Sequence, residues 1–349
     1  MTRTLAALLL LAATLSACSP AYVLRASWEE AKILARRKPI ARIVADSATD
    51  PQTRRKLLVV QEARLFARDS LGLDAGDSYT LFTRVKSDTL AMVLSAAHRD
   101  RFQAHTWWFP IVGRVPYKGY FDPRDAEREA RRLERKGFDT YVRPTAAFST
   151  LGWFNDPLLS TLLRYDEVSL GNTVIHEITH NTFFAPGQVA FNESFANFVG
   201  GRGAAHFFCA REGAGSARCR DATVSWEDDL VFGEFLSGMV EELEALYARP
   251  ELTRDDKLRE RANVFARARE RYAREVQPRF KGGARPGFLS GPLNNATLIS
   301  RRIYYDRLQL FDRVYRARGG DLRRAVEDII AAARANRADP YAAVAALAP

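Results

Sequence analysis

The first stretch of the chain with a clear hydrophobic pattern runs from about residue 27 to residue 71 and is typical of α-helices. Pro39 is expected to divide its first half into two short helices, because proline removes a backbone hydrogen bond and clashes with the preceding turn. A further helix is predicted to start at Pro51 and to run to Leu71. This part of the chain is therefore predicted to be helical.

The pattern then changes to short runs rich in β-branched and aromatic residues. Strands are predicted at residues 78–85 and 90–97, joined by a turn at Ser87-Asp88. An amphipathic helix is predicted from Pro123 to Lys136, and a further strand at residues 138–144. This segment predicts a small β-rich region.

Helical periodicity dominates the rest of the chain. Helices are predicted at about 226–248, 253–277, 294–317 and 321–335. The predicted fold class is α+β, mainly helical, with the small β-rich region ahead of the helix that carries the candidate chemistry.

The candidate chemistry begins with one helical segment, His176-Glu177-Ile178-Thr179-His180. His176 and His180 are one helical turn apart, so both imidazoles can reach one ion. Glu177 lies about 100° around the helix and is placed to take a proton from water beside that ion. The apolar positions of the same helix fall on a separate arc: Leu170, Val174, Ile175 and Ile178. The alternative is a buried amphipathic helix whose histidines only satisfy hydrogen bonds.

A second predicted helix supplies a candidate third ligand. The turn at Pro186-Gly187 is expected to end the first helix. The second is expected to begin with Asn192 as its N-cap and to stop at Gly200-Gly201. Glu193 would then complete a His, His, Glu ligand set, with the fourth position of a catalytic zinc site left to water. The alternative for Glu193 is a first-turn carboxylate favoured by the helix dipole.

The order of HExxH followed by a Glu on the next helix resembles the gluzincin peptidases. In their thermolysin pattern an Asn precedes the ligand Glu, as Asn192 precedes Glu193 here, and a carboxylate follows one turn later. This chain has Asn197 at that later position, where it is a candidate for supporting a ligand imidazole from behind.

A closer resemblance is to the bacterial predicted-aminopeptidase lipoprotein family, and it covers most of the chain. The segments that carry it are 112–142, 148–163, 176–184 and 190–203. That family usually has small or aliphatic residues inside HExxH and Gln just after it, whereas this chain has Ile178, Thr179 and Asn181. The resemblance implies a zinc peptidase. Together with the pattern along the chain, it leads us to expect a zincin-like catalytic region at 146–349, after an N-terminal helical region at 18–77 and a small α+β region at 78–145.

Gluzincins also suggest where substrate binds. Residues 146–154 are expected to form an edge strand along which the substrate backbone pairs, with Gly152 allowing close approach, the alternative being a plain core strand. Either Tyr304 or Tyr305 is expected to donate a hydrogen bond to the developing oxyanion, the alternative being a packing role. Candidate anchors for a substrate amine, each alternatively a helix cap, are Asp156, Asp166 and Glu167.

Residues 1–17 are predicted to be a lipoprotein signal peptide. Arg3 precedes an apolar run from Leu5 to Leu15 that is too short to span a bilayer. The sequence Leu-Ser-Ala-Cys at its end resembles a bacterial lipobox and implies cleavage before Cys18 and lipid attachment to it. Ser19 favours the outer membrane, with the chain facing the periplasm. The alternative is an ordinary secretory signal.

Composition adds two expectations. Cys209 and Cys219, separated by a Gly/Ser-rich loop, are predicted to form a disulfide in an oxidising periplasm. The formal net charge of +10 would suit nucleic acid, but the arginines alternate with acidic residues along predicted helices. Because no nucleic-acid motif accompanies them, no nucleic-acid partner is predicted.

Together these features predict a lipid-anchored zinc metallopeptidase of the bacterial cell envelope. His176, His180 and Glu193 are expected to hold one zinc ion while Glu177 acts as general base. The predicted activity is that of an aminopeptidase on peptide substrates, with membrane attachment through Cys18. The alternatives are a periplasmic endopeptidase and a non-catalytic, zinc-containing binding or scaffold lipoprotein. No oligomeric state is predicted.

Overall fold

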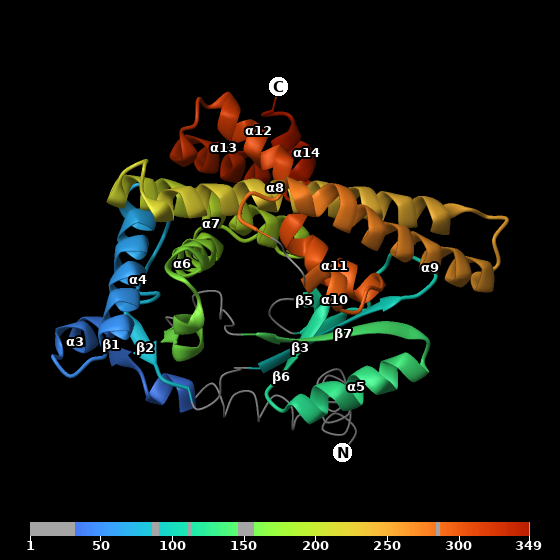
Figure 1. Cartoon of the computed structure of the whole chain (residues 1–349), viewed down its shortest axis with the longest axis horizontal. Helices are drawn as coiled ribbons and strands as arrows, with labels where there is room; N and C mark the ends of the chain where they lie inside the picture. The colour runs from blue at the N-terminus through green and yellow to red at the C-terminus, as the bar shows by residue number, and fades with distance from the viewer. Residues whose placement is uncertain (1–31, 86–90, 110–112, 146–156, 284–286, 349) are drawn as a thin grey trace, which may run out of the picture.

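The computed structural model describes residues 32–85, 91–109, 113–145, 157–283 and 287–348. These residues form a mainly helical structure with small β-sheets, which confirms the predicted α+β class (Figure 1). The predicted signal peptide, Cys18 and the segment 146–156 with Gly152 and Asp156 lie outside the described residues. Within the described residues, no helix combines the length and the apolar character needed to cross a membrane.

The N-terminal region is helical, and its longest helix begins at the expected proline. Asp50 caps this helix by accepting a hydrogen bond from the Thr53 amide at 2.8 Å. Pro39 lies in a two-residue strand directly before a short helix, so the chain is interrupted where the proline was expected to interrupt it. The elements are β1 (Lys38–Pro39), α3 (Ile40–Ala45) and α4 (Pro51–Asp69).

The first two strands of the predicted β-rich region belong to different sheets. β2 (Leu81–Thr83) pairs antiparallel with β1 and parallel with β8 (Leu158–Leu159). β3 (Ala91–His98) lies between β6 (Tyr117–Tyr120) and β7 (Phe138–Thr145), antiparallel to both. The hairpin that a turn at Ser87-Asp88 would produce is therefore not formed, and that turn lies outside the described residues. β4 (Trp107–Phe109) and β5 (Gly113–Val115) form a separate ribbon.

The two faces of the β6-β3-β7 sheet are covered by different helices (Figure 1). On one face, Leu94 and Ala96 of β3 pack against apolar residues of α5 (Pro123–Arg135). On the other face, the Asp139 carboxylate accepts a hydrogen bond at 3.1 Å from the backbone amide of Asn295, the first residue of α11 (Asn295–Tyr305). Because side chains alternate along a strand, the odd-numbered residues of β7 belong to the α11 face.

Long helices form the body of the molecule. In Figure 1, α8 is the long helix that runs across the view, with α6 and α7 on one side and α12 to α14 on the other. The predicted disulfide joins the end of α7 to the start of α8, with Cα atoms of Cys209 and Cys219 4.5 Å apart. The bounds are α6 (Glu167–Thr182), α7 (Val189–Glu212), α8 (Ala217–Ala248), α9 (Arg254–Arg271), α10 (Gly287–Ser290), α12 (Leu308–Ala317), α13 (Leu322–Ala335) and α14 (Pro340–Ala345), with single turns at Ser160–Arg164, Tyr272–Val276 and Gln277–Arg279.

Several predicted helix boundaries are wrong. The helix expected at about 226–248 already begins at Ala217. The helix expected at 294–317 is divided into α11 and α12 by Arg307, whose φ of 51° is left-handed and cannot continue a helix. The stop expected at Gly200-Gly201 does not occur, and α7 continues to Glu212. The glycines serve packing instead, since a Cβ atom on Gly201 would lie 2.5 Å from Cε3 of Trp226 in α8.

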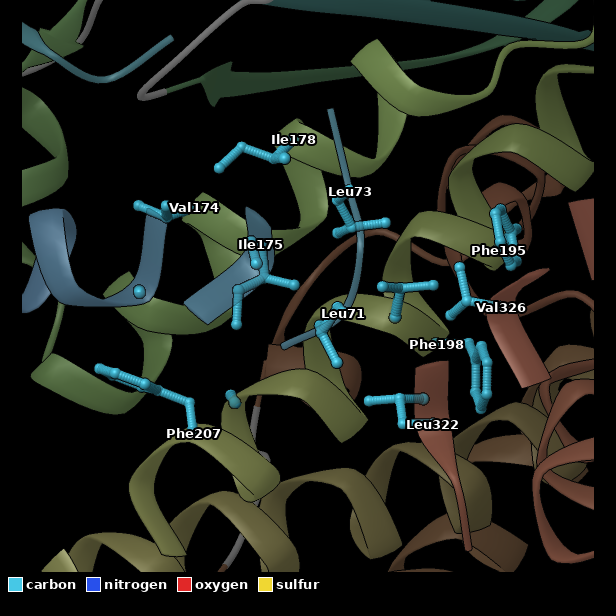
Figure 2. Close-up of a cluster of buried hydrophobic side chains, with 14 of the residues drawn as sticks. Leu71, Leu73, Val174, Ile175, Ile178, Phe195, Phe198, Phe207, Leu322 and Val326 are labelled. Atoms are coloured by element: carbon cyan, nitrogen blue, oxygen red, sulfur yellow. The ribbon is translucent and has the colours of Figure 1, made fainter. Parts of the chain in front are cut away.

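The apolar arc predicted for α6 is confirmed. Leu170, Val174, Ile175 and Ile178 are each 0% exposed and belong to the largest core cluster. Figure 2 shows the part of this core where Val174, Ile175 and Ile178 lie with residues of α7 and α13. Burial of such side chains contributes about 1.5–3 kcal/mol each. The buried arc fixes the rotation of α6 and leaves the opposite arc, with the two histidines, for the site.

We expect Gly201→Ala to destabilise the protein by about 1–3 kcal/mol, because its methyl group overlaps the buried Trp226 ring. Gly238→Ala is the matched control, since Gly238 is exposed in α8 and its added Cβ would meet nothing within 4 Å. That control should stabilise by about 0.5–1 kcal/mol through helix propensity. Urea denaturation of both variants measures the difference, and equal midpoints would contradict the packing role.

Candidate metal centre

The helix α6 is anchored at its start by Asp166 and Glu167, two of the three candidate substrate anchors. Asp166 is its N-cap and accepts hydrogen bonds from the amide and hydroxyl of Ser169, at 2.8 and 2.6 Å. Glu167 forms an ion pair with Arg218 of α8 at 2.7 Å. Both carboxylates hold α6 in place. For Asp166, the alternative role of helix cap is therefore confirmed.

His176, His180 and Glu193 come together in the structure as the sequence predicted. The two Nε2 atoms are 3.2 Å apart. Oε2 of Glu193 lies 3.5 Å from Nε2 of His176 and 3.7 Å from Nε2 of His180. The side chains are 12%, 6% and 16% exposed in that order, so the cluster is largely shielded from water.

This spacing fits one tetrahedral ion. Two ligand atoms about 2.0–2.2 Å from a metal at a tetrahedral angle are roughly 3.4 Å apart, close to the three observed separations. Two imidazole nitrogens and one carboxylate oxygen are also a donor set that suits zinc. Among the described residues, this is the group of three or more candidate ligands whose atoms converge, all within 4.8 Å of one another.

The Glu193 carboxylate and the two imidazoles attract one another even when no cation is bound. Burial alone raises the pKa of the Glu193 carboxyl, but hydrogen bonds from His176 and His180 outweigh it and hold that pKa well below its usual range. Burial lowers the pKa of His180, and the Glu193 carboxylate, assisted by Glu177, outweighs it and shifts the pKa upward. Glu193 is therefore ionised at neutral pH, which is the form that binds a cation.

Close packing of α6 on α7 makes the convergence possible. A Cβ atom on Gly200 would lie 3.0 Å from both the Asn172 carbonyl oxygen and the His176 Cβ. Real Cβ contacts are almost always longer, so only glycine permits this helix separation. The residue that was expected to stop α7 thus brings it against the ligand helix.

The prediction that Asn192 is the N-cap of the second helix is wrong. α7 already begins at Val189, and Asn192 lies inside its first turns, 2% exposed. Its side chain accepts from the Ala185 amide and donates to the Ala185 carbonyl, both at 2.8 Å. Asn192 therefore closes the α6–α7 loop, whose turn at Gly187 has the positive φ of 79° expected there. The residue next to it is Glu193.

The two tyrosine candidates lie on different sides of α11. The Tyr304 ring centroid is 6.3 Å from that of His176. Tyr305 instead packs edge-on against Phe232 of α8 at 5.0 Å. Asn197 does not donate to an imidazole among its described contacts; its amide donates to the Tyr304 carbonyl at 2.8 Å. Asn197 thus connects α7 to α11 beside Tyr304.

The sheet contributes two residues that the sequence analysis missed, Tyr117 and Arg143. Burial and then the charge of Glu193 raise the pKa of both Tyr117 and Tyr304 well above 10, while Arg143 lowers both and Glu177 raises both. The charges of Glu193, Glu177 and Arg143 thus act on both tyrosines. Both phenols keep their protons at neutral pH and can donate hydrogen bonds. The alternation of side chains along the strands indicates that Tyr117 and Arg143 could share one face of a sheet. Which strands pair, and therefore which face this is, depends on the tertiary structure.

The other histidines lie away from the cluster. His206 is within hydrogen-bond distance of the Tyr315 hydroxyl at 2.9 Å. His98 and His105 both pack against Phe138. These contacts give the three histidines packing and hydrogen-bonding roles.

A family model described as "Putative aminopeptidase" matches residues 21–342 of the chain. No curated protein and no solved structure matches it. The matched range includes the three residues of the metal cluster as well as Tyr117 and Arg143 of the sheet.

Asn192→Ala is expected to destabilise the protein by about 1–3 kcal/mol, since it leaves the amide of the buried Ala185 without its partner and removes one of the two hydrogen bonds to the Ala185 carbonyl, which also accepts from the Gln188 amide. Its zinc affinity should fall as well, because the loop and the first turns of α7 hold Glu193 in place. Denaturation and zinc titration measure the two effects. Gln188→Ala, which removes a surface hydrogen bond to Ala338, is the control and should change both by little.

Proposed function

The chain belongs to the putative aminopeptidase family, and we propose that it is a zinc metallopeptidase that removes residues from the N-terminus of peptides. The observation that carries the proposal is the spacing of His176, His180 and Glu193, which matches the ligand separations of one tetrahedral zinc ion. The family supports the peptidase activity, and the donor set supports the metal.

The protein's own residues divide the chemistry between them. A zinc ion, when bound, supplies polarisation of a carbonyl and lowers the pKa of water. Glu177 takes the proton of the attacking water and then delivers it to the leaving amine. Tyr304 is the donor for the oxyanion, because its raised pKa keeps it protonated. Tyr117 is a second donor of the same kind, supplied by the sheet.

Glu177 also distinguishes a peptidase from a scaffold with a structural ion. A structural zinc site is closed by four protein ligands and needs no base. Among the described residues three protein ligands converge, and a carboxylate follows the first of them directly in the sequence. This arrangement favours catalysis over the binding-protein alternative.

We expect Glu177→Gln to retain zinc and to lower kcat by about 100- to 10,000-fold, because only the proton transfer is removed. The substrate is a mixed peptide library, with products read by mass spectrometry and zinc by elemental analysis. His176→Ala is the companion variant and should lose both zinc and activity. Stepwise loss of N-terminal residues supports an aminopeptidase, whereas internal cuts would make it an endopeptidase. Full activity in Glu177→Gln, or a folded wild-type protein that binds no zinc, would contradict the mechanism.

We further propose that the protein is lipid-anchored at Cys18 in the bacterial cell envelope, on the periplasmic side of the outer membrane. The support is the short apolar run with a preceding arginine and the lipobox-like end. The disulfide between Cys209 and Cys219 agrees with an oxidising compartment.

Cys18→Ala should move the protein from the membrane fraction to the soluble periplasmic fraction, because the acyl chains that hold it are lost. Fractionation of cells expressing the two forms measures this, and the mass of the mature wild type should show an acylated N-terminal Cys18. Identical fractionation of the two forms would refute the anchor.

A further inference from the structure

Arg143 lies on the face of the sheet that is turned to α11. Its register partner in β3 is Val93, and Ser95 of β3 pairs with both Tyr141 of β7 and Tyr117 of β6. Two observations fix which face these odd-numbered residues occupy. Asp139 bonds to the start of α11, whereas the neighbouring Thr140 bonds to Glu134 of α5 on the opposite face. Arg143 and Tyr117 therefore project from the α11 face.

The direction of α11 brings this face to the metal cluster. The helix starts over β7, where Asn294 donates to the Thr140 carbonyl at 3.1 Å. It ends on α7, where Ser194 and Asn197 bind the carbonyls of Ile303 and Tyr304. Arg143 follows Thr140 by three residues, or about 10 Å of strand. Its charge acts on the Tyr304 hydroxyl, the same group on which Glu193 acts.

Arg143 is half-buried and has no ion-pair partner among the described residues. Other buried cations among the described residues have partners, either carboxylates or, for Lys56 and Arg64, backbone carbonyl groups. Arg261 binds Asp139 through two hydrogen bonds of 2.6 and 3.0 Å, and Arg202 binds Asp312. Desolvating part of a guanidinium that has no partner costs free energy, unless an anion binds to it and balances its charge.

The sum of the charges around the cluster favours the binding of such an anion. Glu177 and Glu193 carry two negative charges, which a bound divalent ion balances. Arg143 then leaves one uncompensated positive charge beside two neutral tyrosines. A guanidinium binds a carboxylate through two parallel hydrogen bonds.

We infer that Arg143 binds a carboxylate of the substrate close to the bond that is cleaved, so that the preferred substrates are short peptides with an acidic group near that bond. This deepens the proposed peptidase function and rests on it. The carboxylate is either the free C-terminus of a dipeptide or an acidic side chain, and both present the same group to the guanidinium.

The test measures binding to the zinc-loaded Glu177→Gln protein by isothermal titration calorimetry, so that turnover does not interfere. Two matched pairs of peptides separate the sources of the carboxylate: Leu-Ala as free acid and as amide, and Leu-Glu amide and Leu-Gln amide. The acidic member of at least one pair should bind about 10- to 100-fold more tightly, the size expected for a hydrogen-bonded charge pair. Adding Arg143→Gln should abolish that difference, and Arg143→Lys should restore part of it. Thermal denaturation shows that each variant is folded.

Arg135→Gln is the control, because Arg135 is exposed on α5, which covers the opposite face of the same sheet. It removes the same charge and should leave the preference intact. Equal affinities within both pairs, no binding of any peptide, or a preference that survives Arg143→Gln would each overturn the inference. Cleavage of the peptide library by the wild type reports on the peptidase function separately, so the two failures are distinguishable.

Discussion

The close contact between α6 and α7 is the constraint on which the site depends. Both helices carry glycine where they meet: a Cβ on Gly203 would lie 3.0 Å from Cγ2 of Ile175, and one on Gly171 would lie 3.1 Å from Cε2 of Phe208. A glutamate side chain is short, so Glu193 reaches the two imidazoles only when the helix axes are this near. The packing that stabilises the core and the geometry that gathers the ligands are therefore the same interaction.

α11 transmits this geometry to the sheet. Its first residue, Asn295, is 0% exposed and bonds to the Asp139 carboxylate, the His98 carbonyl and the Tyr247 hydroxyl. Its last turn is held by Ser194, whose hydroxyl donates to the Ile303 carbonyl and accepts from the Asp306 amide. Because both ends of α11 are fixed, Tyr304 in its last turn keeps a constant position relative to the ligands. The same holds for Tyr117 and Arg143 on the sheet beneath the helix.

Two buried carboxylates stabilise the structure by binding several partners each. Asp139 is 5% exposed and is bound by Arg261, Arg99 and the start of α11. Asp312 is 2% exposed and is bound by Arg202, Arg316 and the Trp226 indole, which joins α7, α8 and α12. Breaking a buried pair of this kind costs about 3–5 kcal/mol. Arg143 differs from these structural charges, because no described residue forms an ion pair with it, and this difference supports a role in binding a ligand.

The sequence by itself determined what depends on a single helix. The spacing of His176 and His180 and the buried arc that includes Val174 and Ile178 follow from 3.6 residues per turn, whatever surrounds the helix. Local rules failed where a residue serves a distant partner: Gly200 reads as a helix stop and Asn192 as a cap, because propensities describe isolated segments. Only the tertiary structure decided that Tyr304 and not Tyr305 lies beside the ligands, and that Tyr117 and Arg143 join them. Those positions depend on strand register and helix docking, which arise from the sum of many contacts between segments far apart in the chain.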